Sequence, residues 1–238
     1  MHLNIFGKGF NYSQDGPGNR LVYHLSGCHL RCPWCSNPEG LFGSGRVVEA
    51  QEIVREVLSA RPMFFDGGGV TFTGGECTLQ AAALLFVIGQ LKAAGVNVAM
   101  ESNAATKDFL SLASVCDIVI ADYKHPDATI LRTVTGGDLA LIESNLSSLI
   151  GQRFVHLRIP LVHAFNDDDA AIDGFVRFFS QLPRERYDVE ILSYHEYGKE
   201  KWHTCSKEYT VTDGYVEPQR IQALTATLRE AGVRVIKT

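Results

Sequence analysis

The sequence of 238 residues lacks the features that mark membrane-bound, secreted or nucleic-acid-binding proteins. No run approaches the ~18 apolar residues that a membrane-spanning helix needs. The first nine residues lack the apolar core and cleavage pattern of a signal peptide. A formal net charge of −5 argues against nucleic acid or an anionic membrane surface as a partner. We therefore expect a cytoplasmic protein that binds neither nucleic acid nor membrane.

Cysteine is scarce, and its distribution is uneven. Six cysteines in a chain of this size do not suggest a disulfide scaffold. Cys77, Cys116 and Cys205 share no spacing with one another, and we interpret them as small buried hydrophobes. The other three cysteines fall within eight residues, and this clustering requires a chemical explanation.

Short β-branched runs alternate with helical patterns along the chain, which is typical of repeated βα units and a parallel sheet. We expect strands over residues 21–26, 70–73, 96–100, 118–122, 155–161, 189–193 and 233–236. We expect helices over residues 49–60, 79–94, 107–113, 139–150, 168–181 and 217–231. Six βα units are too few for a closed eight-stranded barrel, so a partial barrel and a doubly wound sheet both fit.

Polar or metal-binding groups follow nearly every expected strand. In either architecture the C-terminal ends of parallel strands meet at one edge, where the chemistry takes place. The groups are the cysteine loop 28–35, then Gly74-Gly75-Glu76, Glu101-Ser102, Asp122 with Lys124, Arg158 within its strand, and His195. This convergence predicts one shared site.

Cys28, Cys32 and Cys35 form a C-x3-C-x2-C loop. Three soft thiolates select iron–sulfur clusters, zinc or copper(I). On a 4Fe–4S cluster, three cysteines leave one iron open for another ligand. The alternative is a structural zinc site completed by His24 or His29, and the absence of a second C-x2-C pair argues against it.

At this loop a specific resemblance becomes visible. Residues 27–39 resemble the cluster loop of radical S-adenosylmethionine (SAM) enzymes that activate glycyl radical enzymes. Asp15-Gly16-Pro17-Gly18 and the segment Tyr194-His195-x2-Gly198-Lys199-x-Lys201-Trp202 match the same family, so the resemblance covers almost the whole chain. It implies a partial (β/α)6 barrel of the TIM type with a short N-terminal extension. We expect one radical SAM domain over residues 1–238 without the ferredoxin-like insert of many activases, since no cysteine stands between the triad and Gly74.

The resemblance also implies cofactors and their ligands. One 4Fe–4S cluster is expected on Cys28, Cys32 and Cys35, with SAM on its open iron. Glycines let the backbone approach a ligand closely, and the Gly-Gly-Glu segment is expected at the methionine amino group of SAM. The expected SAM-binding residues are Trp34 (adenine), Asn37, Gly74, Gly75, Glu76, Glu101, Ser102, Asp122, Lys124, Arg158 and His195 (ribose). For each of these residues the competing interpretation is an ordinary turn, cap or core position.

Two further expectations rest on the resemblance. Activases of this type place a monovalent cation beside the SAM carboxylate, here near Glu101, Ser102 and Asp122; Glu101 is longer than the aspartate found there. Asp15, Gly16, Pro17 and Gly18 are expected to line the groove that receives the partner's glycyl loop. Turn formation alone would also explain those four residues.

The implied activity is removal of one hydrogen atom from a glycine of a partner enzyme, with a flavodoxin or ferredoxin as electron donor. A partner of the pyruvate formate-lyase type is favoured because the insert is missing. We expect the chain to act anaerobically and as a monomer. The alternatives are a radical SAM enzyme acting on a small molecule, such as a deazapurine synthase, and a zinc-stabilised binding domain.

Overall fold

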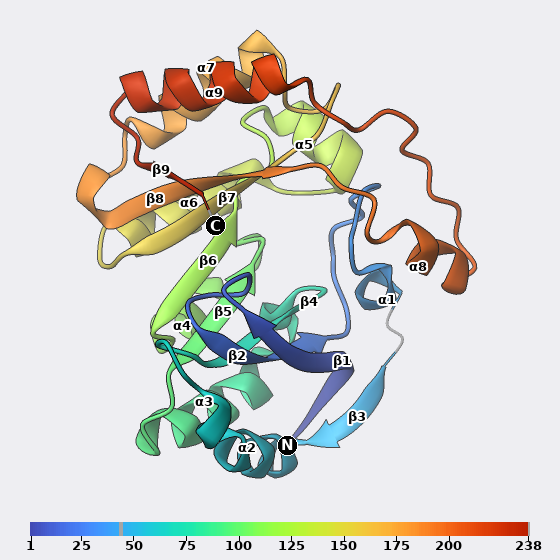
Figure 1. The fold of residues 1–238 in the computed structure, drawn as a ribbon, viewed down its shortest axis with the longest axis vertical. Coiled ribbons are helices and arrows are strands. Elements are labelled where there is room, and N and C mark those ends of the chain that lie inside the picture. The colour runs from blue at the N-terminus through green and yellow to red at the C-terminus, as the bar shows by residue number, and fades with distance from the viewer. Residues whose placement is uncertain (43–44, 238) are drawn as a thin grey trace. The chain divides into compact units, whose positions relative to one another are not determined.

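The computed structural model describes residues 1–42 and 45–237, which form two compact units (Figure 1). Unit 1 comprises Met1–His29, Asn37–Ser102 and Thr106–Ile120, and unit 2 comprises Leu30–Ser36, Asn103–Ala105 and Ala121–Thr238. Strand β6 (Ile118–Asp122) is divided between them. In the described part of the chain, no helix is long and apolar enough to cross a membrane.

The strands of unit 1 follow the order β3-β1-β2-β4-β5. Strands β2 (Asn19–Leu25), β4 (Gly69–Gly74) and β5 (Val98–Ser102) run parallel. Strand β1 (His2–Tyr12) is antiparallel to both β2 and β3 (Arg46–Glu49). The helices of unit 1 are α1 (Pro38–Leu41), α2 (Ala50–Ser59), α3 (Ala81–Ala93) and α4 (Phe109–Ala113), with 3-10 turns η1 (Arg61–Met63) and η2 (Cys77–Gln80).

The two faces of the parallel strands in unit 1 carry different side chains, because successive residues of a strand point to opposite sides. One face is apolar, and Tyr23, Phe72 and Met100 on it are fully buried. The Tyr23 hydroxyl donates to Glu56 Oε2 of α2 at 2.7 Å. The opposite face, which we call the site face, carries Arg20, Val22, His24, Thr71, Thr73, Ala99 and Glu101. Five of these seven residues are polar, so the site face differs from the apolar face opposite it.

Unit 2 contains the parallel strands β7 (Val155–Leu161), β8 (Tyr187–Ser193) and β9 (Val235–Ile236) in that order. Its helices are α5 (Ala128–Thr135), α6 (Leu139–Ile150), α7 (Asp169–Phe179), α8 (Lys199–Thr204) and α9 (Pro218–Glu230), with a 3-10 turn η3 (Arg184–Arg186). Helices α7 and α9 lie side by side (Figure 1).

Aspartate residues fix where three helices of unit 2 begin. The Asp127 carboxylate accepts from the N–H groups of Thr129 and Ile130 at 2.8 Å. Asp138 and Asp168 cap α6 and α7 in the same way. Each cap satisfies backbone donors that have no partner within the helix. Helix α5 ends at Gly136, whose φ of +80° is the left-handed conformation that favours glycine.

An aromatic cluster forms the core of unit 2. The ring of Tyr123 stacks on Phe178 with centroids 4.5 Å apart and contacts Phe175 and Phe179. Its hydroxyl donates to Glu143 Oε1 at 2.6 Å. Burial and this carboxylate raise the pKa of Tyr123, so the phenol stays protonated. A buried tyrosine with its hydroxyl satisfied packs as well as a phenylalanine.

The expected α/β class with parallel strands is confirmed, and the strand order runs from β3 to β9 without closing. Every expected strand is present within a few residues of its predicted bounds. The helix expected over residues 79–94 instead begins with the turn η2, because the Glu76 side chain accepts from Thr78 N. Strands β1 and β3 and helices α1, α5 and α8 were not predicted.

Arg20 is fully buried at the start of β2 and is held by backbone and side-chain oxygens of unit 1. Its Nε donates to Thr71 Oγ1 at 2.7 Å, and its Nη2 donates to Val70 O and Asn97 Oδ1 at 2.8 and 2.9 Å. Its Nη1 reaches Pro17 O at 3.2 Å. Burial lowers the pKa of Arg20 to about 10, which still leaves it charged at neutral pH. One side chain therefore joins β2, β4 and the turn that precedes β2.

We predict that Arg20→Ala lowers the free energy of unfolding by about 3 kcal/mol, since at least two buried acceptors lose their donor at about 1–3 kcal/mol each. Urea denaturation at pH 7 measures the change. The exposed Arg55 of α2 provides the control, and Arg55→Ala should stay within about 0.5 kcal/mol of the wild type. Equal stability of the two variants would mean that the Arg20 network contributes nothing.

Candidate active site

The Gly-Gly-Glu segment follows β4 and lies against the end of β2. Gly75 N donates to Leu25 O at 2.8 Å, and Glu76 N donates to Gly27 O at 2.7 Å. A Cβ on Gly75 would lie 2.2 Å from Gly27 O, and Gly74 has a φ of +121°. Only glycine fits at both positions, because no side chain tolerates that contact or that backbone angle. These glycines approach the backbone of the segment that leads into Cys28, and their expected approach to SAM stays a prediction.

Glu76 is 1% exposed, and donors from Thr78 and Ser102 hold its Oε1. Its Oε1 accepts from Thr78 N at 3.1 Å, Thr78 Oγ1 at 2.6 Å and Ser102 Oγ at 2.8 Å. Ser102 ends β5, as the sequence predicted, and it orients the Glu76 carboxylate. The structure therefore brings two of the expected site residues, Glu76 and Ser102, into direct contact in unit 1.

Glu101 lies on the site face next to Thr73. Thr73 Oγ1 donates to Glu101 Oε2 at 2.9 Å, and Cys77 Sγ contacts the Glu101 carbonyl at 3.3 Å. Burial raises the pKa of the Cys77 thiol, which keeps it protonated. Cys77 thus packs as the small buried residue that its isolated position in the sequence suggested.

The Asp15–Gly18 segment folds over the site face of unit 1. Thr71 Oγ1 donates to the Asp15 carbonyl at 2.7 Å, and a Cβ on Gly16 would lie 3.7 Å from Ala99 Cβ. The Asp15 carboxylate accepts from Asn11 Nδ2. Thr73 and Glu101 lie two residues further along the strands from Thr71 and Ala99, on the same face. Asp15 and Gly16 therefore share one side of the sheet with Glu101, whereas Gly18 lies against the backbone of residues 65–68.

The cysteine loop crosses the boundary between the units, with Cys28 in unit 1 and Cys32 and Cys35 in unit 2. None of these cysteines is in a disulfide. Cys35 N donates to Cys32 O at 3.2 Å, so one turn carries the second and third thiols. Burial raises the pKa of Cys32, and the nearby Lys124 ammonium opposes that shift.

Three thiols on one short loop match the donor set that iron–sulfur clusters prefer. Over residues 1–42 and 45–237, no three side chains of His, Cys, Asp or Glu are close enough together to hold a metal ion. The chemistry of the thiols and a cationic group near Cys32 still fit a cluster bound by thiolates. Asn37 follows this loop and precedes α1, and its carbonyl accepts from Gly40 N at 3.0 Å.

Asp122 and Lys124 lie together at the end of β6 in unit 2. Lys124 Nζ donates to Asp122 Oδ2 at 2.5 Å, and the lysine side chain is 12% exposed. Asn166 Nδ2 donates to the carbonyls of Lys124 and Pro160, at 2.7 and 2.9 Å. Asn166 is fully buried and fixes the Lys124 backbone against the end of β7.

Arg158 has a partner within unit 2. Its Nε donates to Glu190 Oε2 at 2.7 Å, and the two residues are paired across β7 and β8. The side chains are 13% and 7% exposed. Two residues earlier on each strand, His156 Nδ1 lies 2.8 Å from Asp188 Oδ1. Sequence analysis expected Arg158 to bind SAM and did not identify Glu190 as its partner.

Trp34 and His195 lie in aromatic surroundings in unit 2. The Trp34 ring lies 4.5 Å from Phe165 and packs against a cluster of Val162, Phe165 and Tyr194. His195 stacks on Tyr197 at 4.2 Å. Burial lowers the pKa of His195, which favours the neutral imidazole at pH 7.

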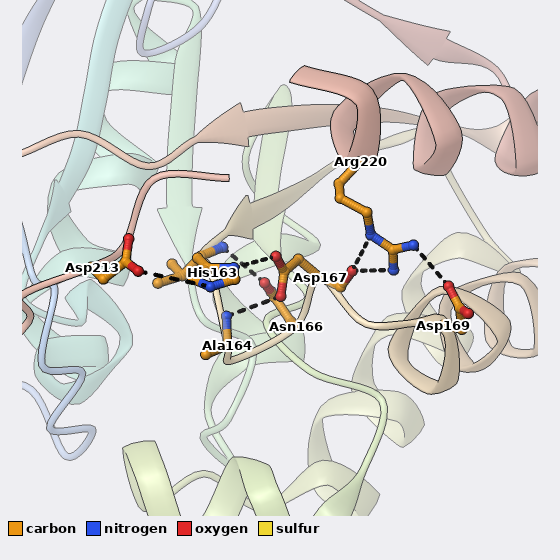
Figure 2. Close-up of polar contacts among 8 residues, drawn as sticks. His163, Ala164, Asn166, Asp167, Asp169, Asp213 and Arg220 are labelled. Atoms are coloured by element: carbon orange, nitrogen blue, oxygen red, sulfur yellow. Dashed lines mark hydrogen bonds and ion pairs between the residues drawn. The ribbon is translucent and has the colours of Figure 1, made fainter. Parts of the chain in front are cut away.

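Sequence analysis missed the loop after β7, whose polar contacts Figure 2 shows. Asp167 contacts His163 Nδ1 through Oδ2 at 2.8 Å and accepts from Ala164 N through Oδ1 at 2.9 Å. Arg220 of α9 donates to the Asp167 carbonyl and to Asp169 Oδ1. These contacts hold the loop that carries Asn166. The signal in the sequence was the run Asn166-Asp167-Asp168 between β7 and α7, which resembles an ordinary helix cap.

Comparison with known proteins identifies the family. Residues 22–175 match the family model described as Radical SAM superfamily. The pyruvate formate-lyase-activating enzyme of Staphylococcus aureus (strain USA300) is 32% identical over 228 residues, which cover 90% of this chain and 89% of that protein. The pyruvate formate-lyase 2-activating enzyme of Escherichia coli (strain K12) is 29% identical over 260 residues, which cover 92% and 86%.

Solved structures share the fold. A domain of a pyruvate-formate lyase-activating enzyme from Bacteroides vulgatus ATCC 8482 superposes with a TM-score of 0.60 at 23% identity, covering 72% of this chain and 99% of that one. A radical SAM methyltransferase from Sphaerobacter thermophilus gives a TM-score of 0.70 at 16% identity, covering 96% and 68%. These findings confirm the resemblance seen in the sequence. The chain belongs to the radical SAM superfamily, and membership implies a 4Fe–4S cluster and SAM as its cofactors.

Proposed function

We propose that this protein is an activase that removes a hydrogen atom from one glycine of a partner enzyme and leaves a glycyl radical there. The observation that carries the proposal is the match to activating enzymes at about 30% identity over some nine-tenths of the chain. A partner of the pyruvate formate-lyase type is favoured by the names of these relatives. A flavodoxin or ferredoxin is the proposed electron donor, and the chain is proposed to work as a cytoplasmic monomer.

Cys28, Cys32 and Cys35 are the proposed ligands of one 4Fe–4S cluster. When bound, such a cluster supplies the electron that divides SAM into methionine and a 5′-deoxyadenosyl radical. The 5′ carbon of SAM would then accept the hydrogen atom of the glycine Cα. The chain's own task is to hold the two carbon atoms close together and to exclude water and oxygen.

Each unit carries groups that we assign to SAM. In unit 1, Gly74 and Gly75 allow a close backbone approach, and the Glu76 carboxylate, oriented by Ser102, would accept from the SAM amino group. In unit 2, Trp34 offers an aromatic face for adenine and His195 a neutral ring for the ribose. Lys124 and Arg158 supply positive charge for a carboxylate. A cation beside Glu101 and Asp122 is part of the proposal, with the longer Glu101 reaching Thr73.

The substrate groove is proposed to run along the site face of unit 1. The turn over residues 15–18 lies on that face beside Thr71 and Ala99. Arg20 Nη1 donates to the Pro17 carbonyl and so restrains the turn. Gly16 and Gly18 are buried, so the exposed Pro17 and the half-buried Asp15 are the residues of this turn that an incoming peptide would meet.

The test of the activase is an anaerobic incubation of the reduced, cluster-loaded protein with SAM and a candidate glycyl radical enzyme. We expect an EPR doublet from a glycyl radical on the partner, and none when Cys32→Ala replaces the wild type. Turnover of a small molecule in the absence of any protein partner would favour the alternative, a radical SAM enzyme with a small substrate.

Metal content separates the cluster from the zinc alternative. We predict about four iron atoms per chain after anaerobic reconstitution, and less than one after Cys28→Ala, Cys32→Ala or Cys35→Ala. Cys205→Ala is the control, since it lies outside the loop and should keep the wild-type iron content. Zinc near one equivalent without iron would overturn the cluster assignment.

Ser102→Ala tests the orientation of Glu76. Removal of one of three donors to Oε1 should raise the KM for SAM by about threefold to tenfold with little change in kcat, because the loss affects ground-state and transition-state binding alike. The rate of SAM cleavage against SAM concentration measures both parameters. Ser111→Ala, an exposed serine on α4, is the matched control. An unchanged KM would show that Ser102 does not act through Glu76.

A further inference from the structure

The segment Gly198–Trp202 lies directly on the third cysteine of the loop. Trp202 Nε1 donates to the Cys35 carbonyl at 2.9 Å, and Lys201 Nζ donates to the Ser36 carbonyl at 3.1 Å. Both donors come from the first turns of α8, more than 160 residues away in sequence. Cys35 N donates to Cys32 O, so both the N–H and the carbonyl of Cys35 have hydrogen-bond partners.

Gly198 allows this contact. A Cβ on Gly198 would lie 2.6 Å from the Cys35 carbonyl oxygen and 2.7 Å from Ser36 Cα. Its φ of −86° and ψ of −13° are open to any residue, so the close approach explains the glycine better than its backbone conformation does. The start of α8 and the cysteine loop are therefore in backbone contact.

Trp202 is itself firmly held. The residue is 9% exposed, and its ring meets Tyr209 edge-on at 5.8 Å. The Tyr209 hydroxyl lies 2.7 Å from that of Tyr194, which precedes the proposed ribose ligand His195. The contacts with Tyr209 restrain the Trp202 ring. A buried indole N–H usually donates a hydrogen bond, and here its acceptor is the Cys35 carbonyl.

We infer that α8 with Gly198, Lys201 and Trp202 is a clamp that fixes the Cys35 backbone and sets how firmly this cysteine holds its iron. Trp202 and Lys201 are positioning residues, because they act through the carbonyls of Cys35 and Ser36 rather than on the reacting atoms. This inference rests on the proposed role of Cys35 as a cluster ligand. Supporting groups around metal ligands commonly contribute to affinity in this way.

Two variants test the clamp without changing a ligand. Trp202→Phe keeps an aromatic ring in a smaller side chain and removes the Nε1 donor, while Gly198→Ala forces the Cys35 carbonyl to move. His203→Gln is the control, since His203 is on the same helix and is exposed. The first measurement is hydrogen exchange of the cluster-free protein over residues 32–37. The second is the rate at which the reconstituted protein loses iron to a chelator without oxygen.

We expect both variants to speed exchange over residues 32–37 and iron loss by about threefold to tenfold, the equivalent of one hydrogen bond. Exchange in β7 and β8 should stay at the wild-type rate, which a general loss of stability would not allow. Wild-type rates for both variants, with iron bound normally, would overturn the clamp. If the wild-type protein takes up no iron, the ligand assignment itself fails, and exchange in the cluster-free protein still decides whether α8 holds the loop.

Discussion

A close backbone contact at the end of β2 organises the part of the site that lies in unit 1. Gly27 N donates to Gly40 O, and Glu76 N donates to Gly27 O, at 2.8 and 2.7 Å. A Cβ on Gly40 would come within 2.9 Å of Gly75. Three glycines therefore bring the entry to the cysteine loop, helix α1 and the Gly-Gly-Glu turn together, and larger residues would separate them.

Buried charges in both units have partners that also orient them. Arg20 has only neutral oxygens as direct partners, Glu76 accepts from hydroxyl and backbone donors, and Arg158 pairs with Glu190. A buried charge is costly unless its hydrogen bonds are complete. Each of these networks therefore also restrains a segment to which we assign a function: the substrate turn, the SAM amino site and the strand pair β7–β8.

The sequence predicted the parallel strands and the residues at their ends well, because β-branched runs and metal-binding spacings are local signals. Strand β1 was missed because Gly7 and Gly9 interrupt its alternation and its stability comes from pairing with β2 and β3. Helix α8 is short, and its position depends on a contact with Cys35 from far along the chain. Long-range partners of this kind leave no trace in the periodicity of a single sequence.

The hydrogen-bond partners of the site residues also could not be predicted from the sequence. Sequence analysis named Arg158, Lys124 and Glu76, whereas Glu190, Asn166 and Thr78 appeared only once the strands were in register. Asn166 and Arg220 each donate to a backbone carbonyl in a loop. Every residue has such a carbonyl, so the residue type of the acceptor does not reveal the contact. Residue type predicts the chemistry of a site, and three-dimensional packing decides what orients it.

The central claim is that this chain cleaves SAM reductively on a cluster held by Cys28, Cys32 and Cys35. The most direct measurement is 5′-deoxyadenosine formation by the anaerobically reconstituted and reduced protein, with SAM and a peptide of a glycyl radical loop. The account predicts product from the wild type and none from a protein in which any of the three cysteines is alanine. A cluster-loaded, reduced protein that forms no 5′-deoxyadenosine with the peptide present would contradict it.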